Sequence, residues 1–205
     1  MQWLRQNWHR LLTHLVALVP LLVMAFSYLS DRLANPTRYV ILHTGTLGLA
    51  LLVASLACTP VRNLLGWPGA IQIRRALGLY SFLYISLHLA AYAALENELD
   101  SAIIWRDLGE RRAMAIGIVA FLLLLPLAIT STRGWQRRLG KRWRQLHWLI
   151  YLAAPLSVWH YLWLDRDFIR TPVIYAVIVV LLLLLRLLVI PLRRTQKRTT
   201  GRGAS

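Results

Sequence analysis

The segment Lys141–Leu164, KRWRQLHWLIYLAAPLSVWHYLWL, decides the fold of this chain. It places His147 and His160 thirteen residues apart, in a run of aromatic and aliphatic residues that carries no charge after Arg144. On an α-helix this spacing covers roughly 20 Å, which is most of a bilayer hydrocarbon core of about 30 Å. The segment therefore predicts a membrane-spanning helix with one imidazole toward each leaflet.

The rest of the chain repeats this pattern of long uncharged runs between short charged clusters. Of the 205 residues, 58% are hydrophobic. Because a spanning helix needs about 20 apolar residues, we expect an all-α integral membrane protein, a six-transmembrane-helix bundle. Residues 1–192 would form one domain without room for a soluble module, and residues 193–205 a basic, disordered cytoplasmic tail. The expected helices cover about residues 11–30, 39–60, 76–95, 113–132, 145–164 and 171–190.

The charges of the chain predict its orientation. The net charge is +16, and if the N-terminus is cytoplasmic the inner segments hold sixteen cations and no acid. The outer loops then hold seven cations and all eight acids. The positive-inside rule therefore predicts cytoplasmic N- and C-termini (N-in/C-in), with a basic face toward anionic lipid or an acidic partner and no nucleic acid. The single Cys58 argues against a disulfide framework and a multi-cysteine metal site.

The histidines inside the expected helices fall into two layers. Counting 1.5 Å per residue from the inner cations places His14 and His147 near the inner face and His88 and His160 in the outer half, and counting from the outer Arg38 places His43 there too. Histidine commonly holds haem iron, and a bis-histidine site needs two ligands at one depth on facing helices. His88 and His160 meet this requirement best. Each histidine could instead be an interhelical hydrogen-bonding contact, but several polar side chains at depth favour a redox or ion-path role.

Two further features concern the geometry of these sites. On a regular helix His147 and His160 project about 140° apart, and Pro155 between them can kink the helix and change that angle. Arg186 interrupts an apolar helix close to the inner face. Its guanidinium either reaches the membrane surface or neutralises a haem propionate or a phosphate.

Three stretches together resemble the MsrQ family, also called YedZ. They are IRRALGLYSFLYISLHLAAYAALE around His88, STRGWQRRLGKRWRQLHWLIYL around His147 and APLSVWHYLW around His160. The resemblance implies a ferric-reductase-like transmembrane domain, related to the membrane core of NADPH oxidases and six-helix metalloreductases. It also implies b-type haem, one or two per chain, with FMN as a further candidate cofactor.

The resemblance assigns haem ligation to His88, His147 and His160. NADPH oxidases carry a second histidine on the third helix, whereas this chain has Arg74 fourteen residues before His88. An inner iron would therefore use His147 with His14, His147 alone or another ligand, or the flavin would occupy the inner site. His14 and His43 are additional candidates for a haem ligand or pocket. Candidate contacts for a flavin phosphate or a propionate are Arg74, Arg75, Lys141, Arg142 and Arg186.

The implied function is transmembrane electron transfer in the bacterial inner membrane. Electrons would come from a cytoplasmic flavin reductase or from quinone, and would reach a periplasmic molybdopterin methionine sulfoxide reductase that repairs oxidised envelope proteins. The chain would be the electron-transfer subunit and not the sulfoxide-reducing one, with the outer loop 96–112 as the docking surface. The alternatives are a quinol-oxidising cytochrome b or metalloreductase, and a non-redox membrane transport or assembly protein.

Overall fold

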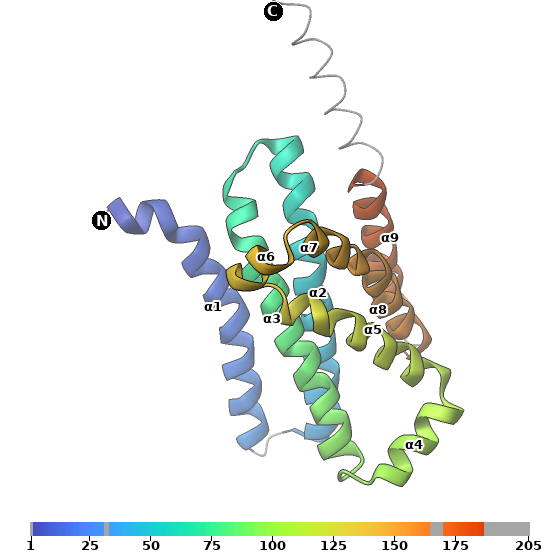
Figure 1. The fold of residues 1–205 in the computed structure, drawn as a ribbon. Helices are drawn as coiled ribbons and strands as arrows, with labels where there is room; N and C mark the ends of the chain where they lie inside the picture. The colour runs from blue at the N-terminus through green and yellow to red at the C-terminus, as the bar shows by residue number, and fades with distance from the viewer. Residues whose placement is uncertain (1, 31–32, 165–169, 187–205) are drawn as a thin grey trace, which may run out of the picture.

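The computed structural model describes residues 2–30, 33–164 and 170–186, so the expected tail 193–205 lies outside the described residues. All regular secondary structure in these three ranges is helical (Figure 1). The elements are α1 (Gln2–Leu29), α2 (Pro36–Leu65), α3 (Gly69–Ala91), the π-helical turn η1 (Tyr92–Glu96), α4 (Ser101–Glu110), α5 (Arg112–Ile129), α6 (Arg133–Leu139), α7 (Lys141–Leu146), the 3₁₀ turn η2 (His147–Leu149), α8 (Ile150–Leu164) and α9 (Arg170–Leu184).

Within the described residues, four helical stretches are long and apolar enough to cross a membrane. They are Trp8–Leu29 of α1, the whole of α2, Gly69–Glu96 across α3 and η1, and the whole of α5. The other two apolar helices, α8 and α9, have fifteen residues each. Helix α8 nevertheless continues from α7 through η2 with no non-helical residue between them.

Local sequence signals explain the ends of α2. The Asn35 side chain accepts a hydrogen bond from the backbone N–H of Arg38 at 2.9 Å, and Pro36 occupies the first turn, where no intrahelical donor is lost. Gly66 ends the helix with φ 72°, a left-handed conformation that glycine adopts without a Cβ clash. The short connection to α3 then lets α2 and α3 pack antiparallel to each other.

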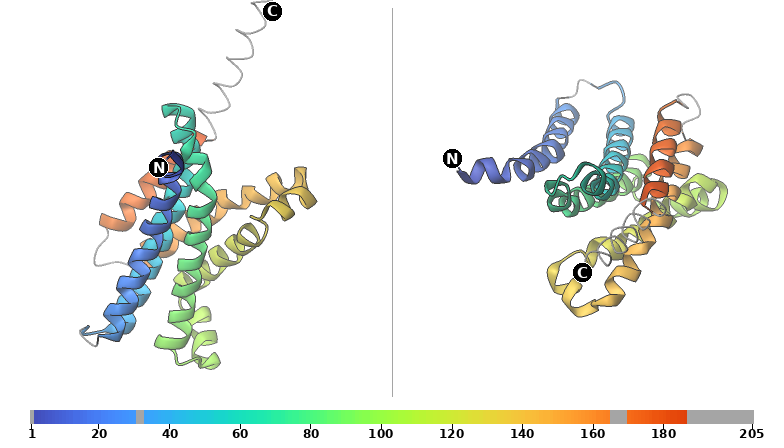
Figure 2. Two further views of the ribbon diagram at one scale, coloured as in Figure 1. Left: turned by 90° about the vertical axis from the view of Figure 1, so that its left-hand side faces the viewer. Right: turned by 90° about the horizontal axis from the view of Figure 1, so that it is seen from above.

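The helices form two antiparallel pairs, α2 with α3 and α5 with α8 (Figures 1 and 2). Apolar side chains of α2, α5, α8 and α9 share one core, in which Ala153 and Ala154 are fully buried. A second core joins α2 and α3, and helix α1 lies against it. There the fully buried Tyr84 donates a hydrogen bond to the carbonyl of Ala17 at 2.7 Å. Between the two pairs, α3 contacts α5 and α2 contacts α8.

The outer loop contains α4, whose N-terminus is capped by Asp100. The structure differs from the expected helix pattern at two places. Helix α1 begins at Gln2 and not at residue 11. The basic connection 133–144 is helical, because Thr132 caps α6 and Gly140, at φ 50°, separates α6 from α7. Helices α6 and α7 project from the bundle on the side of α5 and α8 (Figure 2).

Candidate functional site

The expected outer pair, His88 of α3 and His160 of α8, meets in the bundle. Their ring centres are 6.2 Å apart and their planes lie at 83°. Two imidazoles on opposite sides of one metal, with metal–nitrogen bonds of about 2.0 Å and about 1.1 Å from each nitrogen to its ring centre, would have ring centres roughly 6.2 Å apart. The spacing therefore fits two axial ligands of one iron.

Backbone carbonyls determine which nitrogen of each ring is free. His88 Nδ1 lies 2.8 Å from the carbonyl oxygen of Ile41 in α2, and His160 Nδ1 lies 2.6 Å from that of Ala113 in α5. Because a carbonyl only accepts hydrogen bonds, each Nδ1 carries the proton and donates it. Each Nε2 is then left as a lone-pair ligand, in an orientation held by the second hydrogen bond.

The donor set of this pair suits haem better than a bare ion. Among the described residues, no three His, Cys, Asp or Glu side chains are grouped to hold a metal ion. Two imidazoles leave most of a metal's coordination positions unfilled, whereas haem iron brings its own equatorial nitrogens and needs only axial ligands. The residues present therefore fit a bis-histidine haem.

His147 lies in the turn η2, which comes directly before the helix α8 that carries His160. Its Nδ1 is 3.1 Å from the carbonyl oxygen of Trp143, and the Trp143 ring lies against it at 3.9 Å between centres. A 3₁₀ turn advances about 120° per residue and an α-helix about 100°, so η2 reduces the angle between His147 and His160 from about 140° to about 80°. The change of geometry thus occurs at η2, while α8 runs through Pro155 without interruption.

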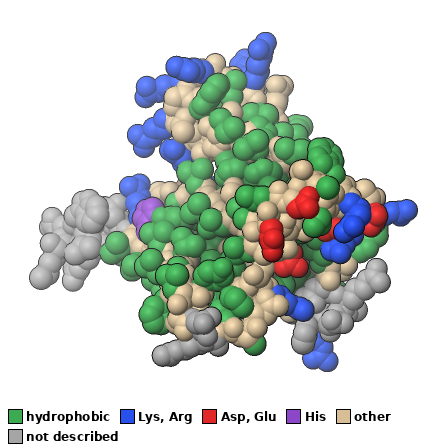
Figure 3. All heavy atoms as spheres, turned by 90° about the horizontal axis from the view of Figure 1, so that it is seen from below, with side chains coloured by type: hydrophobic (Ala, Val, Ile, Leu, Met, Phe, Trp, Pro, Cys, Tyr) green, Lys and Arg blue, Asp and Glu red, His purple; other side chains and the backbone are tan. Residues whose placement is uncertain are grey.

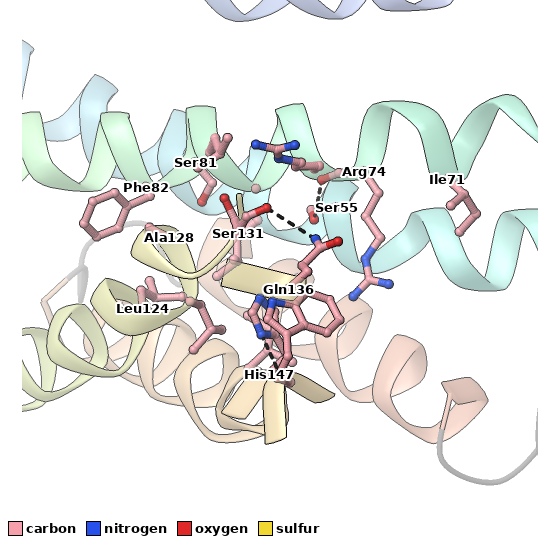
Figure 4. Close-up of a pocket in the computed structure, with 17 residues that line it drawn as sticks. Ser55, Ile71, Arg74, Ser81, Phe82, Leu124, Ala128, Ser131, Gln136 and His147 are labelled. Carbon is pink, nitrogen blue, oxygen red and sulfur yellow. Dashed lines mark hydrogen bonds between the residues drawn. The ribbon is translucent and has the colours of Figure 1, made fainter. Parts of the chain in front are cut away.

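His147 faces a pocket of about 280 Å³ between α2, α3 and α5 and the α6–α8 segment (Figure 4). Arg74, Ser131 and Gln136 are among its polar lining residues, and Phe82 lines its apolar part. The Gln136 side chain donates to the carbonyl of Ser131 at 3.3 Å. Within the described ranges, the Ser131 hydroxyl is buried without a hydrogen-bond partner. The pocket therefore offers an unused polar group beside an imidazole and an aromatic wall.

Two arginines lie near this pocket without acidic partners. Arg74 Nη1 is 3.4 Å from the hydroxyl of Thr59, and Arg186 lies within electrostatic range of Arg74. The Arg186 guanidinium lies 5.4 Å from the ring centre of Tyr151, and its Nη1 is buried without a hydrogen-bond partner in the described part of the chain. All described acids lie between residues 96 and 110, and the one ion pair found there joins Arg111 to Asp107 at 3.4 Å. Both side chains are partly buried and have no described acidic partner, so they would favour an anionic group in this region.

The remaining candidates lie away from this pocket. His14 is exposed and hydrogen-bonds the Tyr80 hydroxyl at 2.7 Å, and His43 is exposed in a separate groove between α1 and α2. Arg75 lines the pocket of His147, whereas Lys141 and Arg142 are exposed and are not among its lining residues. Sequence reasoning missed Ser131 and Gln136. The signal available for them was their position at the polar end of an apolar helix, opposite Arg74 and Arg75.

Comparison with known proteins places this geometry in a family. Residues 44–158 match the family model described as ferric reductase like transmembrane component. A protein-methionine-sulfoxide reductase heme-binding subunit MsrQ from Rhodospirillum rubrum is 41% identical over 196 residues, covering 95% of this chain and 94% of the relative.

The chain belongs to the MsrQ family. MsrQ proteins from Xanthomonas euvesicatoria and Caulobacter vibrioides are 40% and 39% identical, and the aligned parts cover 93% and 82% of this chain and 89% and 80% of those relatives. No solved structure matches the chain. Its apolar helices and its membership of a transmembrane family make this MsrQ-family chain a multi-pass membrane protein.

Proposed function

We propose that this chain transfers electrons across the bacterial inner membrane through b-type haem, as the haem-binding subunit of a methionine sulfoxide reductase system. The observation that carries the proposal is the 6.2 Å separation of the His88 and His160 rings, each with Nδ1 engaged by a backbone carbonyl. The MsrQ relatives are named as heme-binding subunits of protein-methionine-sulfoxide reductase, which supports the same cofactor and system.

In this proposal the protein residues hold and orient the cofactor. His88 and His160 would hold the haem iron through their Nε2 nitrogens, from helices that belong to different antiparallel pairs. The carbonyls of Ile41 and Ala113 keep both rings in one tautomer and orientation. Haem, when bound, supplies a one-electron couple whose potential depends on its ligands and the surrounding dielectric. No bond of the chain needs to form or break.

His147 and its pocket form the second redox site of the proposal. The occupant is FMN, or a second haem held by His147 with His14 or another ligand. Its phosphate or propionate would be neutralised by cationic side chains, for which the absence of nearby described acids is the supporting observation. The cations closest to the pocket are Arg74, Arg75 and Arg186, whereas Lys141 and Arg142 are exposed at the surface and do not line it.

The orientation and partners complete the proposal. The bundle would have six spans with the α7–η2–α8 segment and α9 as the last two, and both termini would be cytoplasmic. The described acids gather on one face of the molecule, over residues 96–110, and Figure 3 shows them beside a broad apolar surface. This face would receive a periplasmic molybdopterin methionine sulfoxide reductase. The opposite, basic face would meet a cytoplasmic flavin reductase or a quinone.

The test of the function is the absorption spectrum of the purified protein and its variants. We expect wild type to show a low-spin bis-histidine haem spectrum, and His88→Ala or His160→Ala to remove the outer haem. His43→Ala, an exposed histidine of the same layer, is the matched control and should leave the spectrum unchanged. A full bis-histidine spectrum in either ligand variant would refute the assignment of that ligand.

A further inference from the structure

We infer that Gly45 and Gly117 are positioning residues that fix the orientation of the two haem ligands. The inference rests on the proposed function and deepens it. It comes from two contacts and from a repeat in the chain, neither of which depends on the cofactor itself.

Both glycines touch an imidazole where a side chain would collide with it. A Cβ at Gly45 in α2 would lie 3.0 Å from both Cε1 and Nδ1 of His88. A Cβ at Gly117 in α5 would lie 2.7 Å from the same two atoms of His160. Carbon atoms in optimal contact are about 3.5–4.0 Å apart, so either methyl group would have to displace the ring. Each ring thus occupies space that only glycine leaves open.

The two contacts are copies of one arrangement. Gly45 follows Ile41, the acceptor for His88, by four residues, and Gly117 follows Ala113, the acceptor for His160, by four residues. Four residues bring the next turn of a helix to the same face, so each carbonyl and glycine lie one above the other.

The two arrangements are related by a constant offset of 72 residues. This offset separates Ile41 from Ala113, Gly45 from Gly117 and His88 from His160. The pair α2–α3 and the pair α5–α8 therefore position their histidines by the same rule. In each pair the carbonyl holds Nδ1 and the glycine admits the ring. A coincidental close contact would not reproduce both the carbonyl acceptor and the glycine at a constant offset.

This arrangement predicts a spectroscopic property of the haem. Because both rings are held on two sides, their planes are kept at 83°, close to perpendicular. Perpendicular axial imidazoles leave the iron d orbitals nearly degenerate, which gives ferric low-spin haem a strongly anisotropic EPR signal. Parallel imidazoles give a smaller anisotropy. The EPR signal thus reports ring orientation, which a change in packing elsewhere would not alter.

The experiment compares Gly45→Ala and Gly117→Ala with wild type as purified holoproteins. We expect haem affinity to fall by about 10- to 100-fold, as for other losses of ligand orientation, with the larger loss at Gly117, where the contact is closer. The haem that remains should show reduced EPR anisotropy. The control is Gly109→Ala, where nothing lies within 4 Å of the added Cβ.

Each result decides the inference. Wild-type haem content and EPR anisotropy in both glycine variants would overturn it while leaving the His88–His160 ligation intact. A wild-type protein without bis-histidine haem would instead overturn the proposed function. If Gly117→Ala fails to fold, as judged by size-exclusion chromatography and circular dichroism, Gly45→Ala decides alone. Its 3.0 Å contact requires a displacement of only a few tenths of an ångström, which leaves the fold in place.

Discussion

Replacing Arg186 by leucine should change stability in opposite directions with and without the inner ligand. In the ligand-free protein the buried Nη1 has no hydrogen-bond partner among the described residues, an unmet requirement that costs about 1–3 kcal/mol. The contact with Tyr151 returns about 0.5–2 kcal/mol as a cation–π interaction. We therefore expect Arg186→Leu to stabilise the ligand-free protein by about 1 kcal/mol.

The same substitution should weaken binding of an anionic ligand. A hydrogen bond to a charged group contributes about 1.5–3 kcal/mol, so loss of one such bond lowers affinity by about 30-fold. The assays are unfolding in mixed detergent micelles for the ligand-free protein, and titration with FMN or haem. The exposed Arg142→Leu is the control and should change neither quantity. A ligand-free Arg186→Leu protein that is less stable than wild type would show that the buried guanidinium is satisfied by the protein, and would refute the reasoning.

Two other contacts give further predictions. Asp107 is 5% exposed and accepts a hydrogen bond from the Tyr92 hydroxyl at 2.8 Å, so Asp107→Asn should cost about 1–3 kcal/mol and loosen α4, detected as faster amide hydrogen exchange over residues 97–111. Equal exchange in the two proteins would contradict this. Tyr84→Phe removes the bond to the carbonyl of Ala17 but keeps the ring, so we expect a loss of about 0.5–1.5 kcal/mol in detergent unfolding with the haem spectrum retained. A spectral change would mean that α1 also positions the ligands.

Much of the site follows from the sequence because depth in a membrane helix scales with residue number. Counting residues paired His88 with His160, and the structure brings their rings together. The same count grouped His43 with them, yet His43 lies in a groove toward α1. Depth alone does not give the direction in which a side chain points. That direction decides whether a histidine at the right depth can act as a ligand.

The inner site shows the same division. The charge pattern identified both Arg74 and Arg142 as candidates and did not distinguish them. In the structure Arg142 is exposed, whereas Arg74 lines the pocket. The connection 133–144 lay between two expected helices. It forms α6 and α7 because the cap at Thr132 and the turn at Gly140 are local features whose effect depends on the helices they join.

The sequence by itself determined the membrane class of this protein and its family, and it predicted the depth of its histidines, because the bilayer requires apolar runs of a set length and makes polar side chains within them conspicuous. Tertiary structure alone decided the rotation of each helix about its axis. That rotation places the imidazole of His88 against Gly45 and that of His160 against Gly117, and the tightened turn at His147 changes the direction of its ring, so it sets which imidazoles meet in the bundle.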